Sequence, residues 1–193
     1  LFKTAVSLEE TGRVQIVALD KTGTITSGQP EVTDILPAEG FTEKELLTLA
    51  LSLEKKSEHP LARAVLKKAE ALSLTAADAE DFQALPGNGL SGKVNGETLT
   101  GGNMKFISSR VTVPASLRKK AENLAEQGKT PLLFARGNQL AGIIAVADVI
   151  KEDSPRAVKE LQNMGIRVVM LTGDNEKTAN AIGRQAGVDQ VIA

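Results

Sequence analysis

The sequence contains no cysteine, no tryptophan and no tyrosine, and its 193 residues include one histidine and five phenylalanines. The absence of cysteine excludes a disulfide framework and any metal site built on thiolates. The scarcity of rings leaves few side chains that could stack on a purine. The longest apolar runs, such as Ala141–Ala147, are far shorter than the roughly 20 residues that a bilayer span requires.

A strong charge of either sign is also missing, because the formal net charge is only -1. This balance gives no reason to expect nucleic acid or an anionic membrane as a partner. With 41% hydrophobic and 24% charged residues, the chain falls in the range of globular proteins. No signal peptide is visible. The chain begins at Leu1 and ends at Val191–Ala193, which reads as the start of a strand, so we expect a piece of a longer polypeptide.

The two ends of the chain have the pattern of a parallel α/β domain. Val14–Asp20 and Gly165–Asp174 are apolar, β-branched runs that end in polar loops, as buried strands do. Ser154–Met164 and Asn175–Ala186 are predicted helices, each followed directly by a glycine. Alternating strands and helices with short loops favour a sheet whose reactive edge lies at the carboxyl ends of its strands.

The middle of the chain has an α+β pattern with an antiparallel sheet. An Asn-Gly pair inside Lys93–Leu99 predicts a hairpin with a type I′ turn. The other expected elements are helices over 42–53, 60–72 and 114–127 and strands over 132–135 and 140–147. We therefore predict an α+β domain, residues 32–147, inserted into an α/β domain made of residues 1–31 and 148–193.

Asp20 is placed by the first strand at the tip of a loop of small, hydrogen-bonding residues. The aspartate could cap the following turn, as an Asp after a strand often does. It could also be a nucleophile, since a carboxylate can form an acyl phosphate. The Thr22–Thr24 segment could then hold phosphate oxygens while Lys21 offsets their charge. Leu171–Asp174 offers a second site of this kind before a helix, or else a capped strand-to-helix turn.

The motif DKTGT at Asp20–Thr24 resembles the phosphorylation motif of the P-type ATPases, within the haloacid dehalogenase superfamily, and Leu171–Ile182 resembles their second phosphate motif. The resemblance implies a Rossmannoid phosphorylation domain with an inserted nucleotide-binding domain. It also implies that ATP phosphorylates Asp20 and that Mg²⁺ is held by Asp20 and Thr22. The residues that it assigns to catalysis are Asp20, Lys21, Thr172 and Asp174.

The histidine lies in SEHP, Ser57–Pro60, at the predicted start of a helix. On its own, His59 would most simply be a cap or a surface residue. The stretch resembles the Ser-Glu-His-Pro motif of the heavy-metal-transporting P-type ATPases, in which the histidine and an upstream glutamate recognise adenine. Glu54 is similar in position to that glutamate.

The glycine-rich stretch Pro86–Gly96 fits two phosphate-binding patterns, G-x-G-x-x-G and G-x-x-x-x-G-K. Both are rejected, because each requires a helix to follow and a strand with a hairpin follows here. A glycine-rich turn between strands is the simple interpretation. The family resemblance instead implies that Gly87, Gly89, Gly102 and Asn103 lie beside the nucleotide, where glycine lets the backbone approach a ligand.

Asp148 and Lys151 lie where the chain returns from the inserted domain. They could be solvated charges near a helix start. The resemblance implies that they meet the nucleotide phosphates, with a hinge formed by the two crossings, Pro30–Asp34 and Ala147–Ile150.

The resulting prediction is the ATP-binding and phosphorylated portion of a heavy-metal P-type ATPase, with copper(I) as cargo and zinc or cadmium as alternatives. The expected partners are ATP or ADP and the rest of the same polypeptide, with the fragment at the cytoplasmic face of a membrane. The phosphorylation domain is expected to be incomplete, and its catalysis impaired. A soluble phosphatase is a second interpretation, disfavoured because Thr22 stands where those enzymes have an acid/base aspartate. A non-catalytic nucleotide-binding module is a third.

Overall fold

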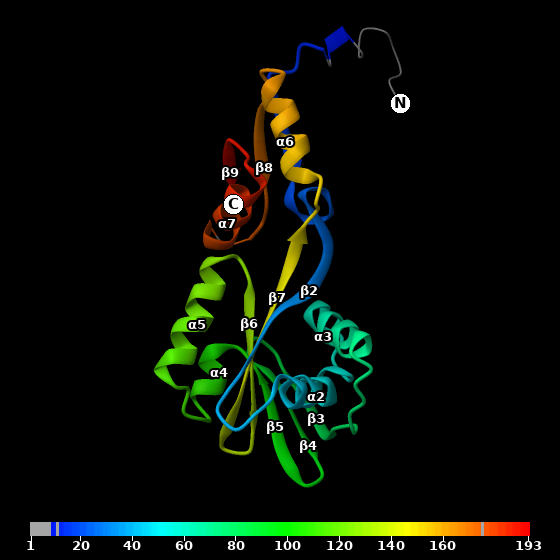
Figure 1. The fold of residues 1–193 in the computed structure, drawn as a ribbon, viewed down its shortest axis with the longest axis vertical. Helices are drawn as coiled ribbons and strands as arrows, with labels where there is room; N and C mark the ends of the chain where they lie inside the picture. Colours follow the sequence, from blue (N-terminus) through cyan, green and yellow to red (C-terminus); the bar gives the residue numbers. More distant parts are fainter. Residues whose placement is uncertain (1–8, 11, 175) are drawn as a thin grey trace. The chain divides into compact units, whose positions relative to one another are not determined.

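The structure, a computed structural model, describes residues 9–10, 12–174 and 176–193. The chain divides into two compact units (Figure 1). Unit 1 contains both ends of the chain, up to Gly28 and from Val149 onward, and unit 2 is Gln29–Asp148. Two long strands, β2 (Thr26–Pro37) and β7 (Gln139–Ile150), run across the two unit boundaries. Both crossings therefore lie within extended strands.

Unit 1 contains a parallel sheet of three strands in the order β1-β8-β9. Its elements are β1 (Ile16–Asp20), a tight turn η1 (Lys21–Ile25), α6 (Ser154–Asn163), β8 (Arg167–Leu171), α7 (Glu176–Ala186) and β9 (Gln190–Ile192). Helix α6 begins with Pro155 in its first turn and is followed by Gly165 at φ 80°, a left-handed conformation that favours glycine. Met170 and Ile182 join the sheet to α7 in a small core. The predicted parallel α/β arrangement is confirmed.

Unit 2 contains a six-stranded sheet in the order β2-β7-β6-β5-β4-β3. The pairs from β3 to β7 are antiparallel, as predicted. The remaining elements are α2 (Glu43–Glu54), α3 (Pro60–Ala71), β3 (Glu80–Leu85), β4 (Gly89–Val94), β5 (Glu97–Gly102), α4 (Met104–Ser108), α5 (Ala115–Glu126) and β6 (Thr130–Arg136). Asn95 and Gly96 both have positive φ, as a type I′ turn requires.

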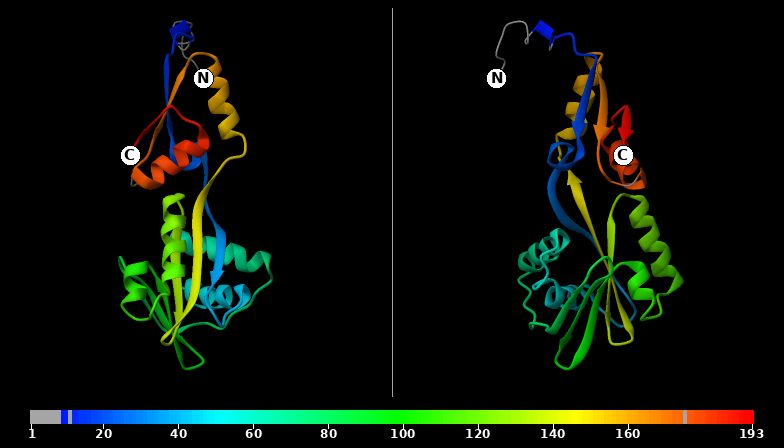
Figure 2. Two further views of the ribbon diagram at one scale, coloured as in Figure 1. Left: turned by 60° about the vertical axis from the view of Figure 1, so that its left-hand side comes forward. Right: turned by 180° about the vertical axis from the view of Figure 1, so that it is seen from behind.

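The helices of unit 2 cover both faces of its sheet (Figures 1 and 2). Helices α2 and α3 pack on one face around Phe134 and Ile144. Helices α4 and α5 pack on the other face around Leu133 and Ile143. Neighbouring residues of one strand point to opposite faces of a sheet, so a continuous apolar run supplies both cores.

Several elements differ from the sequence-based expectation. Strand β2 and helix α4 were not predicted, and β1 begins at Ile16 rather than Val14. Helix α2 starts one residue later than predicted because Thr42 is its N-cap, in a capping box with Glu45. The start predicted for the last helix, Asn175, lies outside the described residues.

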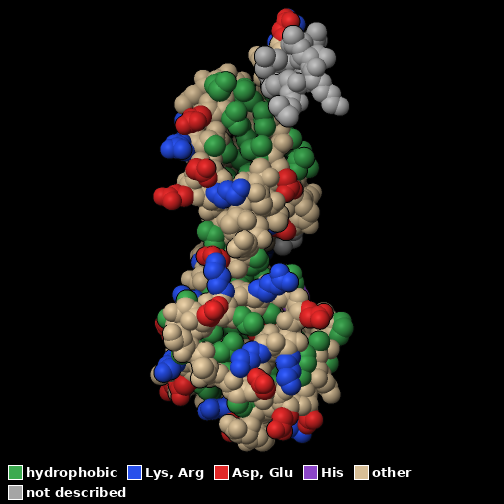
Figure 3. Space-filling model, turned by 90° about the vertical axis from the view of Figure 1, so that its right-hand side faces the viewer, with side chains coloured by type: hydrophobic (Ala, Val, Ile, Leu, Met, Phe, Trp, Pro, Cys, Tyr) green, Lys and Arg blue, Asp and Glu red, His purple; other side chains and the backbone are tan. Residues whose placement is uncertain are grey.

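On the face shown in Figure 3, acidic and basic side chains are interspersed.

Candidate functional site

Asp20 is the last residue of β1 and is exposed at the carboxyl end of the parallel sheet, in register with Leu171 of β8. Its side chain makes no capping hydrogen bond to the turn that follows. The capping alternative is therefore excluded, and the described residues provide this carboxylate with no hydrogen bond or ion pair. An exposed carboxylate at this edge is available to react or to bind a cation.

The loop after Asp20 is held in place by residues from the returning chain. The Lys151 ammonium donates a hydrogen bond to the Gly23 carbonyl, over 2.8 Å. The Ile25 carbonyl accepts from the Lys151 amide at 3.1 Å and from the Ser154 hydroxyl at 2.9 Å. Lys151 thus contacts the loop after Asp20 directly. Ser154 was not singled out from the sequence, although a serine before Pro155 at a helix start is a signal for such a contact.

The two loops predicted to bind phosphate are joined by an ion pair in unit 1. The Lys21 ammonium lies 2.6 Å from Asp174 Oδ2, and only 10% of its side chain is exposed. Thr172 Oγ1 accepts a hydrogen bond from the Asp174 amide at 3.2 Å. Lys21 therefore turns toward the second loop, where its charge is compensated. Asp20, Lys21, Thr172 and Asp174 all belong to the carboxyl edge of one sheet.

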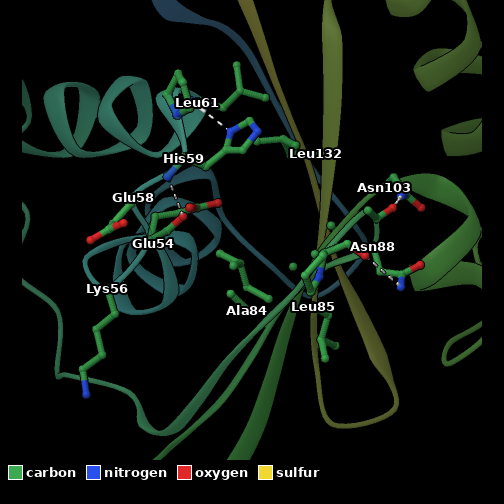
Figure 4. Close-up of a pocket in the computed structure, with 18 residues that line it drawn as sticks. Glu54, Lys56, Glu58, His59, Leu61, Ala84, Leu85, Asn88, Asn103 and Leu132 are labelled. Atoms are coloured by element: carbon green, nitrogen blue, oxygen red, sulfur yellow. Dashed lines mark hydrogen bonds between the residues drawn. The ribbon is translucent and has the colours of Figure 1, made fainter.

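A pocket of about 810 Å³ opens in unit 2 between the α2–α3 connection and the ends of β3, β4 and β5 (Figure 4). Its lining contains all six residues that the family resemblance assigned to nucleotide binding in the inserted domain: Glu54, His59, Gly87, Gly89, Gly102 and Asn103. These residues come from separate segments that the fold brings together. Asp148 and Lys151 do not line this pocket, so their contact with nucleotide phosphates stays a prediction.

His59 is both the N-cap of α3 and part of the pocket wall (Figure 4). Its Nδ1 accepts a hydrogen bond from the Leu61 amide at 3.2 Å, and its own amide donates to Ser57 Oγ at 3.3 Å. Because Nδ1 acts as an acceptor, the proton of the neutral ring resides on Nε2. The capping role expected for a lone histidine is therefore present together with a position in the pocket.

Glu54 ends α2 and is buried, with 6% of the residue exposed. Burial raises the pKa of its carboxyl to about 7, against a smaller lowering by a hydrogen bond from the Ser57 side chain. Ser57 thus links Glu54 to the main chain of His59. The sequence placed Ser57 within SEHP without assigning it this role.

Glycine is found at these pocket positions for two different structural reasons. A Cβ at Gly89 would collide with the Gly101 carbonyl, and one at Gly102 with the Asn88 carbonyl, so these two are required by strand packing. Gly87 has open space around it and φ 73°. Asn103 caps α4 through the Phe106 amide and donates from Nδ2 to the Gly87 carbonyl at 2.8 Å. Asn103 therefore holds the glycine turn in place at the pocket rim.

The chain belongs to the haloacid dehalogenase-like hydrolase family, whose model matches residues 14–193. More particularly, it is 43% identical, over its whole length, to copper-transporting ATPase 1 of Rhizobium meliloti (strain 1021), and 39% identical to the copper-exporting P-type ATPase of Bacillus subtilis (strain 168). It spans 23% and 24% of the lengths of those two relatives.

A solved structure with a similar fold is the crystal structure of a zinc-transporting PIB-type ATPase in the E2.Pi state. That structure and this chain share 39% sequence identity with a TM-score of 0.88, over 98% of this chain and 31% of the other. The expected Rossmannoid domain of the haloacid dehalogenase superfamily with an inserted α+β domain is confirmed. None of the helices in the described part of the chain has the length and hydrophobicity of a bilayer span.

Proposed function

We propose that this chain is the ATP-binding and phosphorylated portion of a heavy-metal-transporting P-type ATPase. The observation that carries the proposal is Asp20, an exposed carboxylate without a partner among the described residues, at the start of DKTGT and at the carboxyl edge of a parallel sheet. The copper-transporting and copper-exporting relatives favour copper as the cargo. Zinc is the alternative, since the similar solved structure is zinc-transporting.

The reaction is an in-line phosphoryl transfer from ATP, the substrate, to Asp20. A carboxylate oxygen of Asp20 forms a bond to the γ-phosphorus while the bond from that phosphorus to the β,γ-bridging oxygen breaks. The electron pair of the broken bond leaves with ADP. The product is an aspartyl phosphate, which the complete pump would use to drive metal movement.

The other residues at the sheet edge orient the transferred group. The Asp174 carboxylate fixes the Lys21 ammonium 2.6 Å away, which places a cation beside the reacting loop. Thr172 offers its hydroxyl at the end of β8. Lys151 and Ser154 keep the loop in shape through the Gly23 and Ile25 carbonyls.

Magnesium fits the donor set at this edge. Mg²⁺ is usually bound through one or two carboxylates together with phosphate oxygens and waters, and the Asp20 carboxylate has no competing partner among the described residues. Asp20 and the Thr22 backbone carbonyl would hold the ion. When bound, Mg²⁺ neutralises charge on the phosphates.

The pocket of unit 2 binds the base of the nucleotide in this proposal. Glu54 and the His59 Nε2–H supply polar groups on one wall, and Gly87 lets a ligand approach the backbone on the other. In the complete protein, the remaining polypeptide would provide the transmembrane metal path and the actuator domain, with this portion at the cytoplasmic face.

The proposal is tested by incubating the chain with Mg²⁺ and ATP labelled in its γ-phosphate. Since the catalysis of this chain is predicted to be impaired, we expect a slowly accumulating, acid-stable and hydroxylamine-sensitive phosphate on the wild-type chain. We expect none on Asp20→Asn, while both bind ATP with the same affinity. The matched control is Asp153→Asn, an exposed aspartate that should leave labelling unchanged. Label that persists in Asp20→Asn would contradict the assignment of the nucleophile.

A soluble phosphatase of the same family would be distinguished by its substrates. Such an enzyme would hydrolyse small phosphate esters with turnover, whereas an aspartyl phosphate used for transport is expected to persist. Thr22 follows Asp20 at the position of the acid/base residue in the phosphatases, which favours the pump.

A further inference from the structure

Glu54 is an unusual carboxylate, because glutamates are rarely buried without a charged partner. It lies at the C-terminal end of α2 and lines the pocket, yet only 6% of the residue is exposed. Among the described residues, no lysine or arginine forms an ion pair with it. Its side chain receives one hydrogen bond, from the Ser57 side chain.

The other titratable groups that line the pocket all come from the α2–α3 connection. They are Lys56, Glu58 and the capping residue His59. The Lys56 ammonium donates a hydrogen bond to the Ala79 carbonyl, 2.6 Å away. Lys56 and Glu58 extend away from Leu85 and Asn88 on the opposite wall (Figure 4). The pocket residues from β3, β4, β5 and β6 carry no charge, and no charge–charge interaction contributes to the pKa shift of the Glu54 carboxyl.

This environment favours the neutral acid. Burial is the largest influence on the carboxyl and raises its pKa to about 7, although the Ser57 hydrogen bond opposes the shift. A substantial fraction of the ligand-free protein therefore holds Glu54 as a carboxylic acid at neutral pH. Such an acid carries one O–H donor and one carbonyl acceptor, whereas the ionised group offers acceptors alone.

The two protonation states suit different nucleobases. The edge of adenine presents an acceptor, N1, beside the N6 amino donor, so a carboxylic acid forms two hydrogen bonds with it. A carboxylate forms only the bond from N6 and faces the N1 lone pair. Guanine presents the N1 and N2 donors side by side, which a carboxylate accepts together.

We propose that Glu54 binds adenine as the neutral acid, so that nucleotide binding takes up a proton and adenine selectivity is lost as the pH rises. The inference rests on the proposed function, in that the base occupies the pocket of unit 2. It makes Glu54 a specificity-determining residue whose protonation selects the base. Ser57 acts as a positioning residue, since its hydroxyl connects Glu54 with the His59 amide.

The test is a calorimetric titration of the whole chain with MgATP and MgGTP at about pH 6.5 and about pH 8.5. We expect the dissociation constant of the wild-type chain for ATP to rise about tenfold between these values, following the loss of one bound proton. Glu54→Gln, whose amide keeps a donor and an acceptor, should bind ATP equally at both values. Glu54→Ala should bind ATP weakly at both pH values. The ionisation of the ATP phosphates affects all three proteins alike, so it cannot account for a difference between them.

Three results would overturn the inference while the proposed function stands. The first is wild-type ATP affinity that does not change with pH. The second is Glu54→Gln binding as weakly as Glu54→Ala at the lower pH. The third is a carbon-13 NMR titration of the ligand-free chain in which the Glu54 carboxyl titrates at the ordinary value for glutamate. Failure of the wild-type chain to bind any nucleotide at either pH would instead refute the pocket assignment of the proposed function, and this inference with it.

Discussion

At the scale of single residues, two carboxylates of the candidate sites have opposite surroundings. Asp20 is exposed at the end of a strand and has no partner among the described residues. Glu54 is buried at the end of a helix, where desolvation favours its neutral form. The first arrangement suits a nucleophile and the second suits a hydrogen-bonding group that recognises a ligand. Asp and Glu differ little in chemistry, so their roles follow from location.

The buried carboxyl also makes the stability of the protein depend on pH. Because its native pKa is raised from 4.5 to about 7, the native state keeps a proton that the unfolded chain releases, and stability falls as the pH rises through this window. Glu54→Gln removes this loss. The difference in unfolding free energy between Glu54→Gln and wild type should therefore change with pH. We expect it to shift by about 2 kcal/mol in favour of the variant as the pH is raised from about 5 to about 8.

Urea unfolding at the two pH values measures this difference. Glu58→Gln, an exposed neighbour, is the matched control and should show no such gain. An equal difference between wild type and Glu54→Gln at both pH values would show that the Glu54 carboxyl does not titrate in this window.

At the scale of elements, the residue that caps helix α3 also lines the pocket. The N-cap is His59, whose Nδ1 accepts from the Leu61 amide, and Pro60 occupies the first helical position. The same ring lines the pocket. One side chain thus caps the helix through one nitrogen and also forms part of the pocket wall.

These two roles separate in a pair of substitutions. His59→Asn keeps a short side chain that caps helices well, so we expect its unfolding free energy to stay within about 0.5 kcal/mol of wild type. The glutamine side chain of His59→Gln is one methylene longer, so its oxygen cannot accept from the Leu61 amide in the same geometry. We expect this variant to lose about 1 kcal/mol of unfolding free energy. Both variants should bind ATP more weakly because both lack the ring.

Chemical unfolding and ATP titration of the two variants check these expectations. If the asparagine and glutamine variants lost equal stability, the Nδ1 hydrogen bond would not be stabilising α3. If either variant bound ATP as tightly as wild type, the ring would have no part in recognition.

At the scale of the whole molecule, the chain consists of two units with separate hydrophobic cores. Unit 2 is one continuous segment, Gln29–Asp148, with an apolar core on each face of its sheet. Unit 1 is built from both ends of the chain around a smaller core. A continuous segment with its own cores has the properties of an independently folding domain.

We therefore expect residues 29–148, expressed alone, to unfold cooperatively and to bind ATP with the affinity of the full chain within about threefold. In the full chain, ATP should raise the unfolding temperature of unit 2 without a comparable effect on unit 1. Differential scanning calorimetry with and without ATP measures both. A segment 29–148 without a cooperative transition would show that unit 2 depends on unit 1 for its folding.

Local sequence patterns were sufficient for most elements, whereas the residues of the pocket were predicted from the resemblance to heavy-metal P-type ATPases. Apolar β-branched runs predicted β1 and β8, and Asn95-Gly96 predicted the hairpin, because turns and strands depend on neighbouring residues. Strand β2 was missed because its polar and apolar residues follow no simple alternation. It is a strand because it lies beside β7 in the sheet, a contact between residues far apart in the chain.

The sequence by itself determined the candidate site residues, through the resemblance of DKTGT, SEHP and the glycine-rich stretch to P-type ATPase motifs: Asp20, Glu54, His59 and the pocket glycines. Only the tertiary structure decided their environments. Folding buries Glu54, turns Lys21 toward Asp174, and places Lys151 on the loop after Asp20. The physical reason is that backbone conformation depends mainly on nearby residues, whereas solvation and charge pairing depend on which distant segments pack around a side chain.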